Sequence, residues 1–127
     1  MGRIIPPEPR DSEVARRRTP RIPTDWLGRC KLEDQPETDW RECKVVDISL
    51  LGAGVEIVGA VLYDMVGERI EVKVEPPVGR SVILDLFGVV KNQKDLVGRT
   101  KVGLEFAHLS ESERVILQVV EQLKMFW

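Results

Sequence analysis

Two short groups of polar residues in this 127-residue sequence have the side-chain types needed to hold an anionic, planar ligand. The first group is Arg17 and Arg21, four positions apart, with Arg16 and Arg18 beside them. The planar guanidinium of arginine forms paired hydrogen bonds with phosphate or with a base edge, and it stacks on flat rings. The proline before Arg21 keeps its preceding residue out of helical geometry. An extended segment is therefore expected to present these arginines.

The second group follows after 25 intervening residues and consists of Asp47, Ser49 and Gly52. The carboxylate of Asp47 can accept two N–H donors at once, as a guanine edge presents them, and Ser49 can donate or accept. Gly52 allows a flat ligand to approach the backbone closely, or allows a positive φ. Alone, an Asp-x-Ser turn usually stabilises only its own backbone. The two groups in this order are a more specific signal for a binding site.

Charge is distributed unevenly along the chain. Residues 1–22 hold six arginines and three acidic residues, a net charge of +3, whereas the remainder has a net charge of −5. Residues 1–23 are also rich in proline and lack apolar periodicity, which predicts a flexible arm that carries the arginine group. A solvated tail without a ligand is the alternative interpretation of such a run. Residues 24–127 are predicted to form the folded body.

Short apolar runs between turn residues predict a mainly β fold for the body. Polar turns are expected at Asp34–Thr38 and Gln93–Gly98, and Gly88 predicts a bulge. Closing six antiparallel strands into a small barrel removes their exposed edges, so a barrel is favoured over a sandwich. The expected strands are Trp26–Leu32, Trp40–Ile48, Gly52–Val58, Glu68–Glu75, Ser81–Asn92 and Arg99–Phe106.

The last segment changes to a helical period. Ser110 and Glu113 fit a capping box, in which each side chain binds a free backbone N–H at the start of a helix. A C-terminal α-helix is therefore expected, with its apolar stripe on the barrel or, as the alternative, against a partner. The stripe consists of Ile116, Val119, Val120 and Leu123.

Composition excludes several classes of protein. The longest run without a charged residue, Ile48–Val55, is far shorter than the roughly 20 residues of a membrane-spanning helix. With no secretion leader either, we expect no membrane span and a cytoplasmic location. Two cysteines, Cys30 and Cys43, and one histidine, His108, predict free core thiols and neither a metal site nor a cofactor. Ser49 has no histidine near it in sequence, so no catalytic residue and no enzyme activity are expected.

With both groups in place, the sequence resembles the PilZ domain family. The family signature pairs Arg-x-x-x-Arg with Asp-x-Ser-x-x-Gly, which here are Arg17–Arg21 and Asp47–Gly52. Residues 86–91 and 102–106 resemble the late hairpin of the family, and the resemblance covers about residues 15–125. It implies a six-stranded barrel that binds the bacterial second messenger cyclic di-GMP.

The resemblance also implies a role for each site residue. Arg17 and Arg21 would grip guanine edges and phosphates. Asp47 and Ser49 would hold a guanine, and Gly52 would permit its close approach. The arginine before Arg17 would influence whether one ligand or a stacked pair is bound, with the pair favoured. Binding would draw the arm onto the barrel and change the surface presented to a downstream protein, which the sequence does not identify.

Two alternatives stay open. Some members of the family bind no ligand and act as protein adaptors, typically after losing the arginines or the Asp-x-Ser pair, and both are present here. The other alternative is a nucleic-acid-binding arm on a small barrel. It is disfavoured because the body carries a net charge of −5 and its strands hold no cluster of aromatic residues for base stacking.

Overall fold

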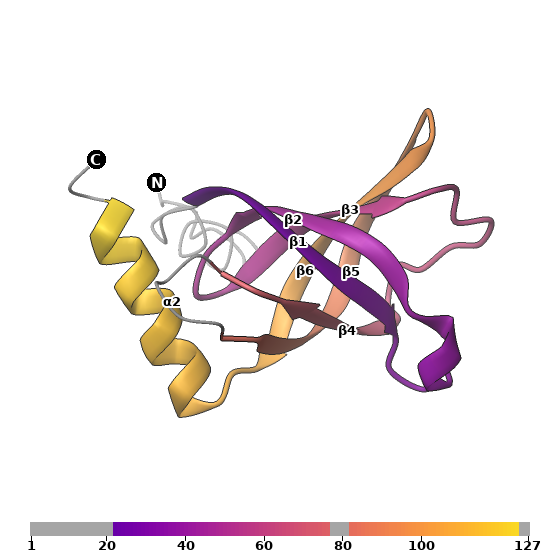
Figure 1. Cartoon of the computed structure of the whole chain (residues 1–127). Helices are drawn as coiled ribbons and strands as arrows, with labels where there is room; N and C mark the ends of the chain where they lie inside the picture. The colour runs from indigo at the N-terminus through magenta and orange to yellow at the C-terminus, as the bar shows by residue number, and fades with distance from the viewer. Residues whose placement is uncertain (1–21, 77–81, 125–127) are drawn as a thin grey trace, which may run out of the picture.

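The structure, a computed structural model, describes residues 22–76 and 82–124 (Figure 1). A single-turn 3-10 helix, η1 (Glu37–Asp39), precedes the second strand, and helix α2 (Glu111–Lys124) follows the sixth. No helix in this part of the chain is long and apolar enough to cross a membrane. The strands are β1 (Ile22–Leu32), β2 (Arg41–Ile48), β3 (Gly52–Val58), β4 (Arg69–Val74), β5 (Leu84–Leu96) and β6 (Arg99–His108).

The six strands close into one antiparallel barrel in the order β1-β2-β3-β6-β5-β4. The barrel is closed by β1 and β4, which pair from Gly28↔Val74 to Leu32↔Ile70. Each strand therefore has a hydrogen-bonded neighbour on both sides, which protects its edges from pairing with other chains. The predicted mainly β fold, a six-stranded antiparallel barrel followed by a C-terminal helix, is confirmed.

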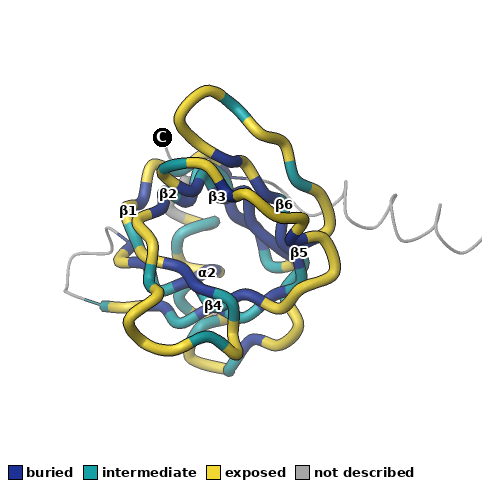
Figure 2. The backbone as a smooth tube through the Cα atoms, turned by 90° about the vertical axis from the view of Figure 1, so that its right-hand side faces the viewer, coloured by how far each residue is buried: buried dark blue, intermediate teal, exposed yellow. Residues whose placement is uncertain are grey.

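Buried and more exposed residues follow one another along the strands that form the ring (Figure 2). On β4, the side chains of Ile70, Val72 and Val74 are buried, and the charged residues between them face outward. This confirms the predicted alternation. Truncating such a core side chain to alanine costs about 2–5 kcal/mol for isoleucine or leucine, because a cavity remains.

Strand β5, Leu84–Leu96, lies further along the chain than the predicted strand at Ser81–Asn92. It continues to Leu96, through most of the predicted polar turn at Gln93–Gly98, and the actual turn is Val97–Gly98 with Gly98 at φ +77°. In Figure 1 the β5–β6 hairpin projects beyond the barrel. Its residues from Lys94 to Arg99 are exposed or half-buried. Polar residues are therefore compatible with a strand there, and polarity alone could not mark its end. The predicted bulge is confirmed by a register shift between Phe87 and Gly88.

Strand β1 begins at Ile22, four residues before the predicted Trp26. The buried side chain of Ile22 pairs with Ile48 of β2. The ladder is irregular between Pro23 and Trp26, and the hydroxyl of Thr24 donates to the carbonyl of Val45 at 2.6 Å. Because a proline and a bulge interrupt the alternation, the sequence pattern hides this start.

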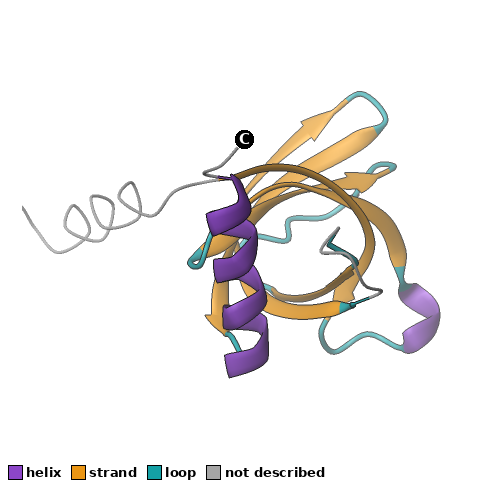
Figure 3. Cartoon of the chain, turned by 60° about the vertical axis from the view of Figure 1, so that its left-hand side comes forward, coloured by secondary structure: helices purple, strands orange, loops and turns teal. Residues whose placement is uncertain are grey.

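Helix α2 begins with the predicted capping box. The backbone N–H of Glu113 donates to Ser110 Oγ at 3.2 Å, and the Ser110 N–H donates to Glu113 Oε1 at 3.0 Å. The apolar stripe is rotated from its predicted position, because Leu117 is buried while Val119 is 43% exposed. The helix lies across one end of the barrel, the end at the left of Figure 1 and toward the viewer in Figure 3.

A cluster of carboxylates joins this helix to the barrel. Glu113 uses its second oxygen, Oε2, to accept the backbone N–H of Asp85 at 3.2 Å. Partial burial and the neighbouring carboxyl groups of Glu71 and Glu113 raise the pKa of Asp85 to about 6. One oxygen of Asp85 is inaccessible to solvent and accepts no hydrogen bond. The barrel surface under the helix therefore favours a protonated Asp85.

Candidate ligand-binding site

The Asp47–Ser49–Gly52 group lies at one end of the barrel, where β2 turns into β3. The start of β1 lies beside it, since Ile22 pairs with Ile48 and Pro23 pairs with Asp47. The four predicted arginines, 16, 17, 18 and 21, lie outside the described residues, but Arg21 is bonded directly to Ile22.

Ser49 is buried and its hydroxyl serves its own turn. Its Oγ accepts the backbone N–H of Leu51 at 3.1 Å and that of Gly52 at 3.3 Å. The backbone N–H of Ser49 donates to the carbonyl of Gly52 at 2.9 Å. This is the Ser turn that sequence reasoning held as the simpler explanation, and it fixes the β2–β3 connection rigidly.

Gly52 is required by the packing of two strands. A Cβ on Gly52 would lie 2.0 Å from the carbonyl oxygen of Leu104 on β6. Real Cβ atoms do not approach a backbone oxygen so closely, so any other residue would push β3 and β6 apart. The structure thus provides a reason for this glycine that does not involve a ligand.

Asp47 points outward and lies over Gly54. The backbone N–H of Gly54 donates to Asp47 Oδ1 at 3.1 Å. A Cβ on Gly54 would be 2.7 Å from Asp47 Oδ2, so the carboxylate occupies the space that a side chain would fill. The β2–β3 register shifts between Val45 and Asp47, and this irregularity directs the carboxylate across β3.

A second polar side chain repeats this arrangement from the other side. Gly54 pairs with Gly103 of β6, and Gly103 pairs with Asn92 of β5. A Cβ on Gly103 would lie 2.7 Å from Asn92 Nδ2, so the amide covers this glycine as the carboxylate covers the other. The register again shifts, between Val90 and Asn92. Sequence reasoning missed Gly54, Gly103 and Asn92, because only the strand register brings them to Asp47.

Four strands thus present a polar row on the outer surface: carboxylate, glycine, glycine, amide. The carboxylate accepts hydrogen bonds, and the amide of Asn92 both donates and accepts. Such a row can recognise a flat heterocycle that has donors and acceptors on its edge.

The comparison with protein families decides the assignment of this chain. The sequence matches the family described as the PilZ domain over residues 15–122. The chain belongs to the PilZ domain family. The resemblance inferred from the two motifs is therefore confirmed.

Solved PilZ structures have the same fold. The inhibitor of motility MotI/DgrA of Bacillus subtilis aligns with a TM-score of 0.69 and 14% identity, over 84% of this chain and 50% of that one. The PilZ domain of YcgR from Escherichia coli aligns with a TM-score of 0.63 and 18% identity, over 83% of this chain and 88% of that one.

A structure that holds more of YcgR aligns with a TM-score of 0.60 and 22% identity, over 87% of this chain and 46% of that one. The present chain thus spans about half the length of MotI and of this YcgR chain. The comparison with curated proteins gives no match.

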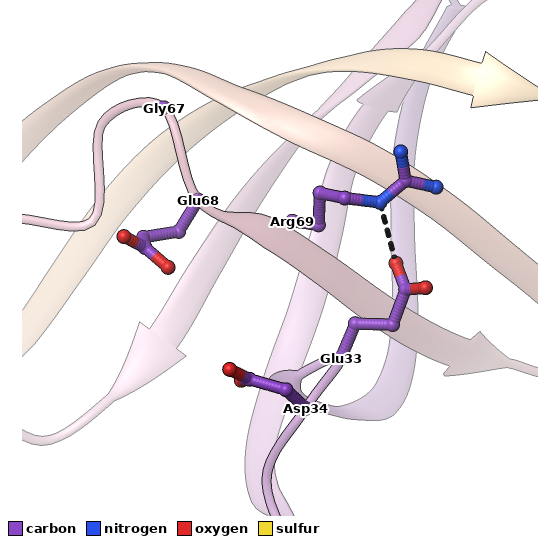
Figure 4. Close-up of a pocket in the computed structure, with 5 residues that line it drawn as sticks. All are labelled: Glu33, Asp34, Gly67, Glu68 and Arg69. Atoms are coloured by element: carbon purple, nitrogen blue, oxygen red, sulfur yellow. Dashed lines mark hydrogen bonds and ion pairs between the residues drawn. The ribbon is translucent and has the colours of Figure 1, made fainter.

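The PilZ domain also has a hollow of about 410 Å³ at the far end of β1 (Figure 4). It is lined by Glu33, Asp34, Gly67, Glu68 and Arg69, and Arg69 is paired with Glu33 at 2.9 Å. Eleven residues of β1 place it about 35 Å from Ile22. Its three carboxylates against one arginine repel a phosphate, so it does not suit an anionic ligand.

Other reactive side chains of the domain lie elsewhere. Cys30 and Cys43 are buried free thiols, and a hydrogen bond with Cys43 together with burial raises the pKa of Cys30. A thiol held protonated in this way is a poor nucleophile. His108 is exposed at the end of β6. Across residues 22–76 and 82–124, no group of three or more potential ligands could hold a metal ion.

Proposed function

We propose that this chain is a receptor for cyclic di-GMP and works through ligand binding alone, without catalysis. One observation carries the proposal. The Asp47 turn is paired with the first residues of β1, and the Arg-x-x-x-Arg segment directly precedes β1 in the sequence. This pairing supports a single site made of the two halves of the family signature, which are 25 residues apart in sequence.

The ligand has the chemistry that these residues match. Each guanine presents two N–H donors on one edge and two acceptors on the other, and the ring of the molecule carries two phosphates. Asp47 accepts the N–H donors of one guanine, and the Asn92 amide donates to an acceptor of the base. Arg17 and Arg21 bind the phosphates and the guanine acceptors.

The remaining signature residues have supporting roles in this proposal. Ser49 and Gly52 hold the turn and the β3–β6 contact that position Asp47. Arg16 directly precedes the motif and favours a stacked pair of ligands over one, and Arg18, between Arg17 and Arg21, adds to the ligand contacts. The structure of the YcgR PilZ domain with c-di-GMP supports the assignment, since that protein has the same fold.

Ligand binding also provides a signal in this proposal. Residues 1–21 contain few large apolar side chains, so we expect little buried area to hold them to the barrel when the ligand is absent. A ligand that bridges Arg17 and Arg21 to Asp47 orders the segment, and a downstream protein in the cytoplasm reads the changed surface.

Calorimetric titration with cyclic di-GMP, with GTP and cyclic GMP as controls, tests the proposal. Cyclic di-GMP should bind, and Asp47→Asn should weaken it about tenfold or more, the scale of a lost charge-assisted hydrogen bond. Asp34→Asn, in the acidic hollow, is the matched control and should bind normally. Equal affinity of the three nucleotides, or no effect of Asp47→Asn, would overturn the proposal.

A protein adaptor that binds no ligand is the second candidate, and one observation favours it. The Ser49 hydroxyl is fully engaged by its own turn, so this half of the signature is stable without any nucleotide. Absence of cyclic di-GMP binding by a folded chain would select this candidate. Competition by any RNA or single-stranded DNA, abolished by moderate salt, would instead indicate a nucleic-acid-binding arm.

A further inference from the structure

A second surface lies at the other end of the barrel from the Asp47 turn. The loop between β3 and β4, residues Gly59–Glu68, runs beside the projecting β5–β6 hairpin (Figure 1). Between this loop and β5 is an open cleft of about 570 Å³, here called the loop cleft. Seven residues of β3 separate the Asp47 turn from this loop, a distance of about 20 Å. On β5, Asn92 of the polar row is followed directly by Gln93 of the cleft, and strand alternation directs their side chains to opposite faces. A molecule at one surface therefore leaves the other accessible.

The loop is held in place by hydrogen bonds to the hairpin. The N–H of Val61 donates to Thr100 Oγ1 at 3.2 Å, and the N–H of Met65 donates to Gln93 Oε1 at 2.8 Å. The Gln93 amide donates in turn to the carbonyl of Tyr63 at 3.2 Å. Val61 and Met65 are also buried in the core. The cleft is thus preformed, which lowers the entropic cost of binding.

Three apolar side chains between these anchors face solvent. Leu62 is 91% exposed, Val66 is 47% exposed and Tyr63 is 44% exposed, and all three line the cleft. The loop is already held by its hydrogen bonds and by the buried side chains of Val61 and Met65. Its structure therefore does not require apolar residues at the three exposed positions. A grouped set of exposed apolar side chains beside a hollow is typical of an interaction site.

The charges of the loop cleft are all negative. Asp64 and Asp95 line it, and neither forms an ion pair in the described part of the chain. The loop itself contains no lysine or arginine. Lys94 is adjacent to Asp95, but strand alternation directs its side chain to the other face of β5. A cation from outside would therefore gain two carboxylate partners in the cleft.

We propose that the loop cleft binds a segment of a partner protein in which an aliphatic or aromatic side chain is flanked by lysine or arginine. The apolar side chain packs against Leu62, Tyr63 and Val66, and the cation lies between Asp64 and Asp95. This docking goes beyond nucleotide binding and does not depend on it, because the cleft is formed entirely by residues 61–66 and 93–95.

The test uses two 14-residue amphipathic peptides, one of leucine and lysine and one with glutamate replacing every lysine, and ¹⁵N-labelled full chain without nucleotide. The leucine–lysine peptide should shift the amide signals of residues 61–66 and 93–95, and the leucine–glutamate peptide should bind at least tenfold more weakly. Val66→Ser should weaken binding about fivefold. Val119→Ser, an equally exposed valine on α2, should leave it unchanged.

Asp64→Asn combined with Asp95→Asn should remove the preference between the peptides while the melting temperature stays within about 2 °C. Cyclic di-GMP should bind Val66→Ser with unchanged affinity, so a failed docking test leaves the proposed receptor function intact. Three results would overturn the docking proposal: shifts on another face, equal binding of both peptides, or shifts caused by protein concentration alone, which would identify a second copy as the occupant.

Discussion

Two glycines on β3 allow the binding role of the turn to be separated from its structural role. Gly52 and Gly54 both lie on β3, and each is blocked from carrying a side chain by a different neighbour. At Gly52 the neighbour is the backbone carbonyl of Leu104, which cannot move without moving β6. At Gly54 it is the carboxylate of Asp47, which can rotate away. We therefore predict that Gly52→Ala mainly lowers stability and that Gly54→Ala mainly lowers ligand affinity.

The magnitudes follow from these contacts. In Gly52→Ala, overpacking costs about 1–3 kcal/mol, and the Gly52 N–H bond to Ser49 Oγ is strained as well. A total of about 3 kcal/mol corresponds to a decrease in melting temperature of about 12 °C or more. In Gly54→Ala, loss of the hydrogen bond from the Gly54 N–H to Asp47 Oδ1 lowers stability by about 1.5 kcal/mol. Replacing a glycine within a strand by alanine raises stability by about 0.5 kcal/mol. The net cost is about 1 kcal/mol, or about 4 °C.

Scanning calorimetry and cyclic di-GMP titration at 20 °C measure the two effects on the same samples. Gly54→Ala should bind the ligand about 10- to 100-fold more weakly, because it displaces the Asp47 carboxylate. Gly52→Ala should change the affinity by less than about fivefold. Wild-type affinity in Gly54→Ala would refute the placement of Asp47 in the site. An unchanged melting temperature in Gly52→Ala would refute the structural role of that glycine.

Three further predictions concern the arginines, the helix contact and the arm. Arg17→Ala and Arg21→Ala should each weaken cyclic di-GMP binding by about 1.5–3 kcal/mol in calorimetry, with little change in melting temperature. The raised pKa of Asp85 means that the folded state binds its proton more tightly, so stability is lost as the pH rises through about 6. Asp85→Asn should therefore be about 1 kcal/mol more stable than the parent in urea unfolding at pH 7.5, a value reduced for solvent screening, and the difference should disappear once the pH falls below 3.8, the ordinary pKa of aspartate. Amide hydrogen exchange should show new protection at residues 16–22 and Asp47–Gly52 when cyclic di-GMP is added, and full protection without ligand would contradict a switching arm.

Much of the fold could be predicted because short sequence patterns indicate its strands, its bulge and the start of its helix. Alternation on β4, the break at Gly88 and the capping box at Ser110 each reflect a contact within a few residues or on one face. The predictions from sequence are wrong where contacts between distant parts of the chain determine the structure. Leu117 replaces Val119 on the packed side of α2, because the tie from Glu113 to Asp85 sets how the helix is rotated on the barrel. A helical stripe in sequence does not contain that constraint.

In the candidate site, too, some residues could be predicted from the sequence, whereas others are brought together only by the fold. The signature residues could be recognised from their spacing, yet the structure assigns Ser49 and Gly52 to the turn itself. The partners of Asp47 are set by register, and the register shifts immediately before it and again immediately before Asn92. Each irregularity adds a residue to one strand only, so no sequence spacing predicts that these two side chains cover paired glycines.

These two irregularities give the site a property that a regular barrel would lack. In an even ladder, outward side chains stand perpendicular to the sheet, and neighbouring ones hold each other apart. Here Asp47 and Asn92 lean from opposite sides over a strip without side chains, and Asp47 is fixed by the Gly54 N–H. The carboxylate is therefore oriented before any ligand arrives, and the strands that hold it belong to the barrel core. In the proposed receptor, specificity for a base would thus reside on the rigid barrel, while the arginines of the segment before Ile22 would determine whether the bound state forms.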